Sequence, residues 1–235
     1  MKIKTYEKIE QWLLEHDIYD YHIRDDLSVD VDNDVDLSEK ELEEIPIQFN
    51  NIIGSFNISN NYLSSLLGSP RRVSDSFIAF SNYLENLKYF PKIVGQNIHL
   101  EDNELKILEY LPKMIRGNLS AENNKIIAFL NPPKLINGLL NLKNNNIISL
   151  KSFPIINGDI ILNENPLNFK IDEINENIKG LLLLDKELPI FKNFSQEETS
   201  DEKIMISISQ LKSLLLKENL DKKLTISQKK ITRKI

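Results

Sequence analysis

The chain of 235 residues contains no cysteine, and this absence removes several kinds of chemistry at once. Without thiols it can form no disulfide bond, no thiolate metal site and no cysteine nucleophile. Histidine is scarce too, because His16, His22 and His99 are far apart and lack the spacing of metal ligands. The sequence therefore predicts no metal site and no cofactor.

Catalytic motifs are also missing from the chain. It has no glycine-rich phosphate loop, no H-E-x-x-H segment and no Ser-His-Asp pattern in a recognisable context. We therefore expect a protein without catalytic residues. The alternative is part of an enzyme whose active site lies in the terminal segments.

Long apolar runs are absent as well, since no stretch approaches the ~18 residues of a membrane-spanning helix. The first residues, Met1–Lys4, lead into a charged segment and do not resemble a Sec signal peptide. These features predict a cytoplasmic protein, or one that reaches a host cell by a non-Sec route.

What the chain does contain is a repeat of constant period. Prolines recur in 21-residue steps at Pro70, Pro91, Pro112, Pro133 and Pro154. A column of leucine or isoleucine keeps the same step, with one shorter step at its end: Leu63, Leu84, Leu105, Ile126, Ile147 and Leu167. An asparagine stands two residues before each of these: Asn61, Asn82, Asn103, Asn124, Asn145 and Asn165. Such a pattern is typical of a leucine-rich-repeat solenoid.

Each repeat also predicts one short strand. Apolar residues alternate over three positions, so that one face of the strand points inward. About eight such coils can be recognised, with the inward pairs Val35/Leu37, Phe56/Ile58, Phe77/Ala79, Ile98/Leu100, Leu119/Ala121, Leu140/Leu142, Ile160/Leu162 and Leu182/Leu184. Strands this short are stable only when they stack into a continuous parallel sheet.

The asparagines and glycines have structural explanations. An asparagine amide carries both donors and an acceptor, so a buried column of them can satisfy backbone groups where the chain turns off each strand. Six of the seven glycines stand two or three residues before a strand, where a tight turn or a close backbone approach is expected. The prolines are expected on the convex side, in extended backbone that needs no N–H partner.

The order of proline, isoleucine or valine, glycine, strand, asparagine and leucines resembles the short leucine-rich repeats of bacterial type. These occur in secreted bacterial effectors and in uncharacterised proteins of tailed phages. The resemblance covers residues 6 to about 184. It implies an α/β repeat with a short parallel sheet on its concave face, and a role as an effector or as a phage-encoded modulator of a host protein. The ubiquitin ligase activity of some effectors is not implied, because its catalytic cysteine is absent.

The segments outside the repeats divide as follows. Residues 1–34 are expected to form an N-terminal cap, with a helix over 5–15 that begins at Thr5 and places Tyr6, Ile9, Trp12 and Leu13 on one face, followed by a hairpin. The repeats occupy 35–185 and a polar linker 186–202. A C-terminal helix over 203–220, begun by a Thr199/Glu202 capping box, is expected to dock on the last coil. A basic tail, 221–235, ends the chain.

The acidic N-terminal segment contains a misleading motif. Asp30, Asp32, Asp34 and Glu41 occupy positions 1, 3, 5 and 12 of an EF-hand loop. Val35 replaces the required glycine, and the repeat register assigns this valine to the core. We therefore interpret the alternation as a half-buried strand and expect no calcium site.

Charge is unevenly distributed along the chain. Residues 1–44 contain 15 Asp and Glu against 5 Lys and Arg, a net charge of −10, whereas residues 217–235 contain 7 Lys and Arg against 2 Asp and Glu, a net charge of +5. The acidic end disfavours nucleic acid as a partner. A nucleic-acid or membrane contact through the basic tail is kept as an alternative, although a solvated terminus is the simpler interpretation.

The expected function is non-enzymatic protein–protein interaction through the exposed face of the strands. In the register above, two apolar residues, Ile78 and Phe80, stand among polar neighbours on this face. Such a pair resembles a binding hot spot. The predicted partner-binding residues are Asn57, Ile78, Phe80, His99, Glu101 and Ser120, and the partner is a protein of unknown identity.

Overall fold

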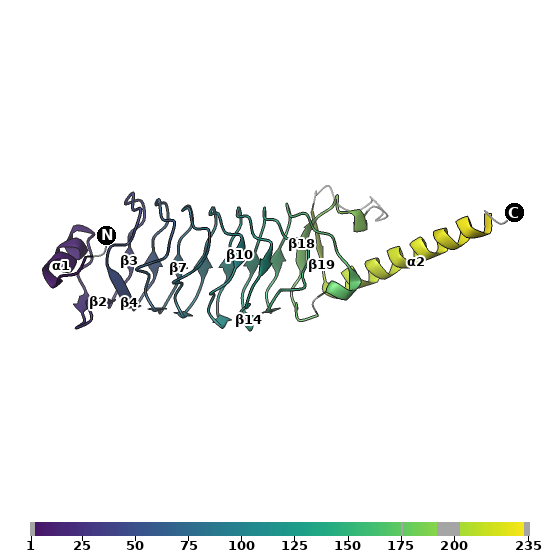
Figure 1. The fold of residues 1–235 in the computed structure, drawn as a ribbon. Coiled ribbons are helices and arrows are strands. Elements are labelled where there is room, and N and C mark those ends of the chain that lie inside the picture. The colour runs from purple at the N-terminus through teal and green to yellow at the C-terminus, as the bar shows by residue number, and fades with distance from the viewer. Residues whose placement is uncertain (1–2, 175, 192–202, 233–235) are drawn as a thin grey trace.

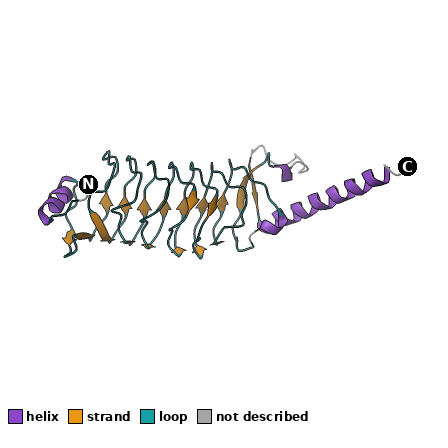
Figure 2. Cartoon of the chain, in the orientation of Figure 1, coloured by secondary structure: helices purple, strands orange, loops and turns teal. Residues whose placement is uncertain are grey.

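The computed structural model describes residues 3–174, 176–191 and 203–232, with side chains as far as residue 220. Over this part the chain forms a parallel β-solenoid of about seven turns, elongated along the stacking axis (Figure 1). Between α1 (Tyr6–Glu15) and the 3-10 turn η1 (Ile171–Glu173), the chain contains only strands and turns (Figure 2). The coils are therefore β-coils, and the expected α/β repeat is corrected, because short coils of extended backbone leave no room for a helix.

The main sheet runs along the whole stack. Its eight parallel strands are β3 (Val35–Asp36), β5 (Phe56–Asn57), β7 (Phe77–Ile78), β9 (Ile98–His99), β12 (Leu119–Ser120), β15 (Leu140–Asn141), β17 (Ile160–Ile161) and β18 (Leu182–Asp185). Equivalent residues of successive coils pair directly, as in Phe56 with Phe77 and Phe77 with Ile98. All the predicted inward pairs are buried, each residue with an exposed fraction of at most 1%. The predicted register is confirmed.

A second row of strands was not predicted. It consists of β2 (Ser28–Val31), β4 (Gln48–Ile52), β6 (Arg72–Val73) and β8 (Ile93–Val94), and then of β11 (Met114–Ile115), β14 (Leu135–Ile136) and β16 (Ile155–Ile156). Two further strands, β10 (Ile107–Leu108) and β13 (Ala128–Phe129), pair with each other. Most of these strands follow the prolines, where unpaired backbone was expected. They pair because a constant period brings the same β-branched and aliphatic residues side by side in neighbouring coils.

The asparagine column does what the sequence predicts. In Asn145 the Nδ2 atom donates to the carbonyl oxygens of Ala121, Leu142 and Lys143 at 2.9, 3.1 and 3.1 Å. Its Oδ1 atom accepts from the backbone N–H of Ile126 at 2.9 Å. The other five members repeat this pattern, and all six are at least 91% buried. Each amide therefore joins its own coil to the preceding coil.

The glycines before the strands serve close approach between coils. A Cβ atom added to Gly138 would lie 2.6 Å from the carbonyl oxygen of Gly117, and one added to Gly158 would meet the backbone of Gly138. Any side chain here would push successive coils apart. The turn on the other side of each strand uses a left-handed residue directly before the buried asparagine, as at Asn60, Asp102 and Asn144. Asn and Asp are the residues that tolerate this conformation best after glycine.

The N-terminal elements lie against the first coils. Helix α1 begins at Thr5, whose hydroxyl accepts from the N–H of Lys8. It buries Ile9, Trp12 and Leu13, whereas Tyr6 at the first turn remains 48% exposed. Strand β1 (Tyr21–Ile23) pairs antiparallel with β2 and forms the expected hairpin.

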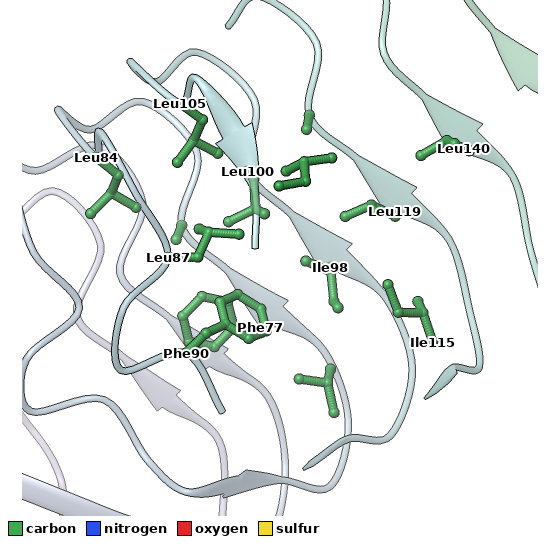
Figure 3. Close-up of a cluster of buried hydrophobic side chains, with 14 of the residues drawn as sticks. Phe77, Leu84, Leu87, Phe90, Ile98, Leu100, Leu105, Ile115, Leu119 and Leu140 are labelled. Carbon is green, nitrogen blue, oxygen red and sulfur yellow. The ribbon is translucent and has the colours of Figure 1, made fainter. Parts of the chain in front are cut away.

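Aromatic rings continue the packing from this helix into the solenoid. The Trp12 ring contacts Phe49 at 6.3 Å, Phe49 contacts Phe56 at 5.2 Å, and Phe56 contacts Phe77 at 5.9 Å between centroids. Phe90 then packs on Phe77 at 4.7 Å, among the leucines and isoleucines of the same coil and of the next coils (Figure 3). A row of aromatic rings thus runs through the N-terminal half of the aliphatic core, and a further pair, Phe129 and Phe153, lies in the part beyond.

The C-terminal segment differs from the prediction of a helix over 203–220. Strand β19 (Lys203–Ile206) pairs antiparallel with β18, so Ile204 lies in a strand that extends the main sheet. Helix α2 spans Ile208–Thr232 and projects away from the solenoid (Figure 1). An alternating segment fits the open edge of β18 better than a helix does, because it satisfies the free backbone groups of that edge.

Helix α2 begins at a capping box later in the chain than the one predicted. Ser207 Oγ accepts from the N–H of Gln210 at 3.3 Å, and Gln210 Oε1 accepts from the N–H of Ser207 at 2.9 Å. The predicted box at Thr199 and Glu202 lies outside the described residues. Leu211 and Leu215, near the start of this helix, are buried.

The rest of the C-terminal division is also changed. The helix backbone continues through 221–232, where a separate tail was expected. Of the expected linker 186–202, residues 186–191 form a turn and the 3-10 turn η2 (Pro189–Phe191), and the remainder is not described. Within the described part of the chain, neither helix combines the length and the apolar character needed to cross a bilayer.

The asparagine column yields a stability prediction. Replacing Asn145 by alanine should lower the free energy of unfolding by about 1–3 kcal/mol, because buried carbonyl and N–H groups of two coils lose their partners. The adjacent Asn146 is exposed, so Asn146→Ala is the matched control and should change little. Urea unfolding followed by circular dichroism measures both. Equal losses in the two variants would contradict the assignment.

Candidate functional site

The main sheet brings the six predicted partner-binding residues together. Asn57, Ile78, His99 and Ser120 are direct neighbours on β5, β7, β9 and β12. Phe80 stands two residues after Ile78, and Glu101 two residues after His99, just beyond the ends of β7 and β9. The prediction that these side chains share one face is consistent with this register. It follows from the fixed period and from the alternation of side chains along a strand.

The two apolar members are less exposed than predicted. Ile78 and Phe80 are both half-buried, and neither belongs to the large exposed apolar side chains of the molecule. In a parallel sheet without offset, each side chain lies between its equivalents on the two neighbouring strands, and these cover part of it. The pair can still contribute apolar area to a contact, but it is not a free-standing anchor.

Asn57 has its amide occupied within the fold. Its Nδ2 atom donates to Asp36 Oδ1 at 3.1 Å, and its Oδ1 atom accepts from both the N–H and the hydroxyl of Ser59, at 3.1 and 2.7 Å. The same motif joins Asp36 to Ser38 in the coil before. Asn57 is therefore part of a polar ladder along the sheet.

His99 and Glu101 form a hydrogen-bonded pair on the same face. The His99 Nδ1 atom lies 3.1 Å from Glu101 Oε1, and the exposed fractions of the two side chains are 36% and 17%. Ser120 lies near enough to the carboxylate to stabilise its charge, but its geometry gives no regular hydrogen bond to Oε2, which is buried without a partner.

The pair shifts both of its pKa values in opposite directions. The hydrogen bond to Glu101 raises the pKa of His99 above 6.5, although partial burial works against this. Burial alone would raise the pKa of Glu101, but the hydrogen bond from His99 and the nearby Ser120 outweigh it and hold this pKa below 4.5. A charged imidazolium–carboxylate pair is therefore favoured over a wider pH range than either group would allow alone.

The pair stabilises the fold only within a range of pH that has an upper and a lower limit. Because the pKa of His99 is raised on folding, its contribution is complete below about 6.5 and is lost as the pH rises through the higher folded value. Because the pKa of Glu101 is lowered, its contribution is present above about 4.5 and is lost as the pH falls through the lower folded value. Stability from this contact is therefore greatest in mildly acidic solution.

The pair does not have the geometry of a catalytic triad. Nucleophilic catalysis needs a hydroxyl bonded to the base and the base bonded to a carboxylate. Here Ser120 lies beside the carboxylate, and no hydrogen bond joins it to the His99 ring in the described structure. The arrangement offers one positive and one negative group to a ligand.

Sequence reasoning missed two tyrosines beside this face. Tyr62 and Tyr83 stand directly after the buried asparagines of two successive coils, and their rings stack at 6.3 Å with an angle of 12°. They are 50% and 56% exposed. They line a hollow of about 520 Å³ with Glu39, Glu41 and Asp102. The signal that could have identified them was their equivalent position in two successive repeats.

The acidic segment around Asp30 has other partners in the fold. Asp30 accepts from Arg24 at 3.0 Å and from Asn50 at 2.7 Å, and Asp34 accepts from the N–H of Ser55 at 2.6 Å. Val35 is buried in the core, as predicted. No group of three or more potential metal ligands gathers anywhere in the described residues.

The His99–Glu101 contact predicts a measurable pKa change. In Glu101→Gln the remaining influence on His99 is partial burial, which disfavours the imidazolium, so the pKa of His99 should fall to about 6.5 or below. NMR titration of the imidazole signals measures this value. Glu122→Gln, one coil further along the same column, is the control and should leave the pKa of His99 near its wild-type value. A pKa that stays raised in Glu101→Gln would assign the shift to another cause.

Comparison with known proteins adds no relative to these observations. No protein-family model matches the chain, and a search of curated proteins finds no significant match.

Proposed function

We propose that this protein is a non-enzymatic scaffold that binds a cationic segment of another protein. The contact surface is the tyrosine groove, defined by Tyr62, Tyr83, Glu39, Glu41 and Asp102, together with the adjoining face of the main sheet. The stacked, exposed tyrosine pair is the observation that carries the proposal.

The tyrosine pair has the properties of a binding anchor. Stacking holds each ring in place, so little side-chain entropy remains to be lost on binding. Tyrosine presents a large apolar face and a polar hydroxyl, and it is enriched among interface residues that carry most of the affinity. Exposing the apolar faces of these rings to water is unfavourable in free energy, and a bound partner would cover them.

The rim of the groove indicates the charge of the partner. Glu39, Glu41 and Asp102 form no salt bridge with any cation in the part of the chain that the structure describes. Carboxylates around an aromatic face favour lysine or arginine, which can lie over a ring while pairing with a carboxylate. The net charge of −10 over residues 1–44 extends this negative field toward the N-terminal end and would speed association with a basic segment.

The adjoining sheet face can extend the contact. Ile78 and Phe80 belong to the coil of Tyr83, and the His99–Glu101 pair lies in the next coil along the sheet. A partner segment lying across the coils would meet aromatic and carboxylate groups first and half-buried apolar groups next. This order suits an extended chain with both basic and apolar residues.

We further propose that the coils are leucine-rich repeats, with α1 and the hairpin as one cap and β19 with the start of α2 as the other. The constant period and the bonding of the asparagine column support the first point. The burial of Trp12 on the first coils and the pairing of β19 on the last strand support the second. The resemblance to bacterial and phage repeats makes a host protein the partner to look for.

A selection from a random peptide library displayed on phage, with the intact chain as bait, tests the function while the partner is still unidentified. Selected peptides should be rich in lysine and arginine. Their affinity for Tyr62→Ala/Tyr83→Ala should be lower by at least about tenfold, or about 1.4 kcal/mol, because both anchors are removed. Fluorescence anisotropy of a labelled peptide measures the change.

The chain offers a matched control for this variant. Tyr89 and Tyr110 are also exposed and also occupy equivalent positions in successive repeats, but they do not line the groove. Tyr89→Ala/Tyr110→Ala should bind the selected peptides as the wild type does. Peptides without basic residues would overturn the cationic partner, and equal loss in both double variants would remove the groove as the binding surface.

A further inference from the structure

A second charged surface lies on a different side of the solenoid. A basic residue directly follows the proline, or the proline pair, in four successive repeats, so that Arg71, Lys92, Lys113 and Lys134 form a row at 21-residue steps. Backbone hydrogen bonds join neighbouring members of the row. The N–H of Lys92 donates to the carbonyl oxygen of Arg71, and the N–H of Lys134 donates to that of Lys113. Lysine and arginine thus gather on one side of a chain whose formal net charge is −6.

The second row of strands is interrupted in the middle of this surface. Strand β8 ends one sheet and β11 begins the next, and no ladder joins the two. A hollow of about 400 Å³ lies at this break, lined by residues of both strands and of the turns beside them. A regular sheet would present a flat surface here, so the interruption creates a recess.

Four cations surround the recess, which we call the cationic hollow: Arg72, Lys92, Lys113 and Arg116. All four are exposed, and none forms a salt bridge with another residue that the structure describes. Elsewhere in the solenoid some surface lysines do pair with a carboxylate, as Lys106 does with Glu85 at 3.0 Å and Lys143 with Glu164 at 3.5 Å. Four like charges around one recess repel each other unless an anion neutralises them.

The remaining lining residues define the chemistry of such an anion. Ser74 and Gln96 supply uncharged hydrogen-bonding groups. Ile93 and Met114, which are 47% and 51% exposed, supply apolar surface between the cations. A ligand with a carbon framework and several anionic groups fits this combination better than a bare inorganic ion does.

We propose that the cationic hollow binds an organic polyphosphate. The two guanidinium groups can each hold a phosphate through paired N–H donors, and the two lysines add point charges. No aromatic residue lines the hollow, so it lacks the stacking groups with which proteins hold single-stranded nucleic acid. The same phosphates could reach the hollow on a free small molecule or on the headgroup of an anionic lipid.

Isothermal titration calorimetry with inositol hexakisphosphate tests the hollow directly. The intact wild-type chain should show saturable binding with one site, and inorganic phosphate should bind far more weakly. In Arg72→Ala/Arg116→Ala the affinity should fall by at least about tenfold, because both paired-donor contacts are lost. These exposed residues lie outside the core, so the variant should keep the wild-type circular dichroism spectrum.

Lys134→Ala is the matched control. Lys134 belongs to the same basic row but does not line the hollow, so its loss should have little effect on affinity. Equal losses from Lys134→Ala and from the double variant would show general attraction to a basic surface and would overturn the proposal. Absence of saturable binding, or unchanged binding by the double variant, would overturn it as well.

Two further binding experiments distinguish a lipid headgroup, a free small molecule and a nucleic acid as the source of the phosphates. Cosedimentation with phosphatidylcholine vesicles that contain phosphatidylinositol bisphosphate, blocked by Arg72→Ala/Arg116→Ala, would identify a lipid headgroup. Binding of inositol hexakisphosphate without cosedimentation would identify a free ligand. Single-stranded RNA that displaces inositol hexakisphosphate, with an affinity that rises with its length, would make this side a nucleic-acid surface and overturn the proposal.

Discussion

The hydrogen bonds of one buried asparagine per coil set the geometry on which the rest of the structure depends. Each amide accepts from a backbone N–H of the coil before it and donates to carbonyl oxygens of both coils. These bonds are satisfied only if every coil turns at the same position and has nearly the same length. Since an unpaired buried amide is costly, the constant repeat length follows from this constraint, and so does the in-register stacking of every other column.

In-register stacking gives the solenoid several sides with separate chemistry. Columns that point inward hold the apolar core, and columns that point outward are free to vary. One outward column contains the stacked Tyr62 and Tyr83 beside carboxylates, and another contains the basic row after the prolines. Like residues therefore accumulate into rows at the strand spacing of about 4.8 Å. The carboxylates beside the tyrosines and the cations of the hollow therefore belong to different columns of the stack.

Inference from the sequence succeeded where a residue type repeats in register. The inward pairs, the asparagine column and the pairing of the main sheet are all as expected, because each is fixed by contacts between equivalent positions. It failed where the outcome depends on what an element meets. Ile204 stands at helical spacing before Ile208, Leu211 and Leu215. It nevertheless lies in a strand, Lys203–Ile206, because β18 offers an open edge. Ile78 and Phe80 were expected to be exposed, but the flanking strands cover part of them. The second row of strands was missed for the same reason, since the partners of two-residue strands lie a full coil away.

The amino-acid sequence by itself determined the period, the residues that face the core and the residues that share a column. Those properties follow from composition at fixed intervals, because burial of apolar groups and pairing of buried amides act identically in each coil. Only the tertiary structure decided which outward columns become candidate sites. The tyrosine groove, the His99–Glu101 pair and the break between β8 and β11 depend on the distances between coils and on which carboxylates and cations lack partners. Such distances arise from packing across neighbouring coils, which a linear pattern of residue types does not contain.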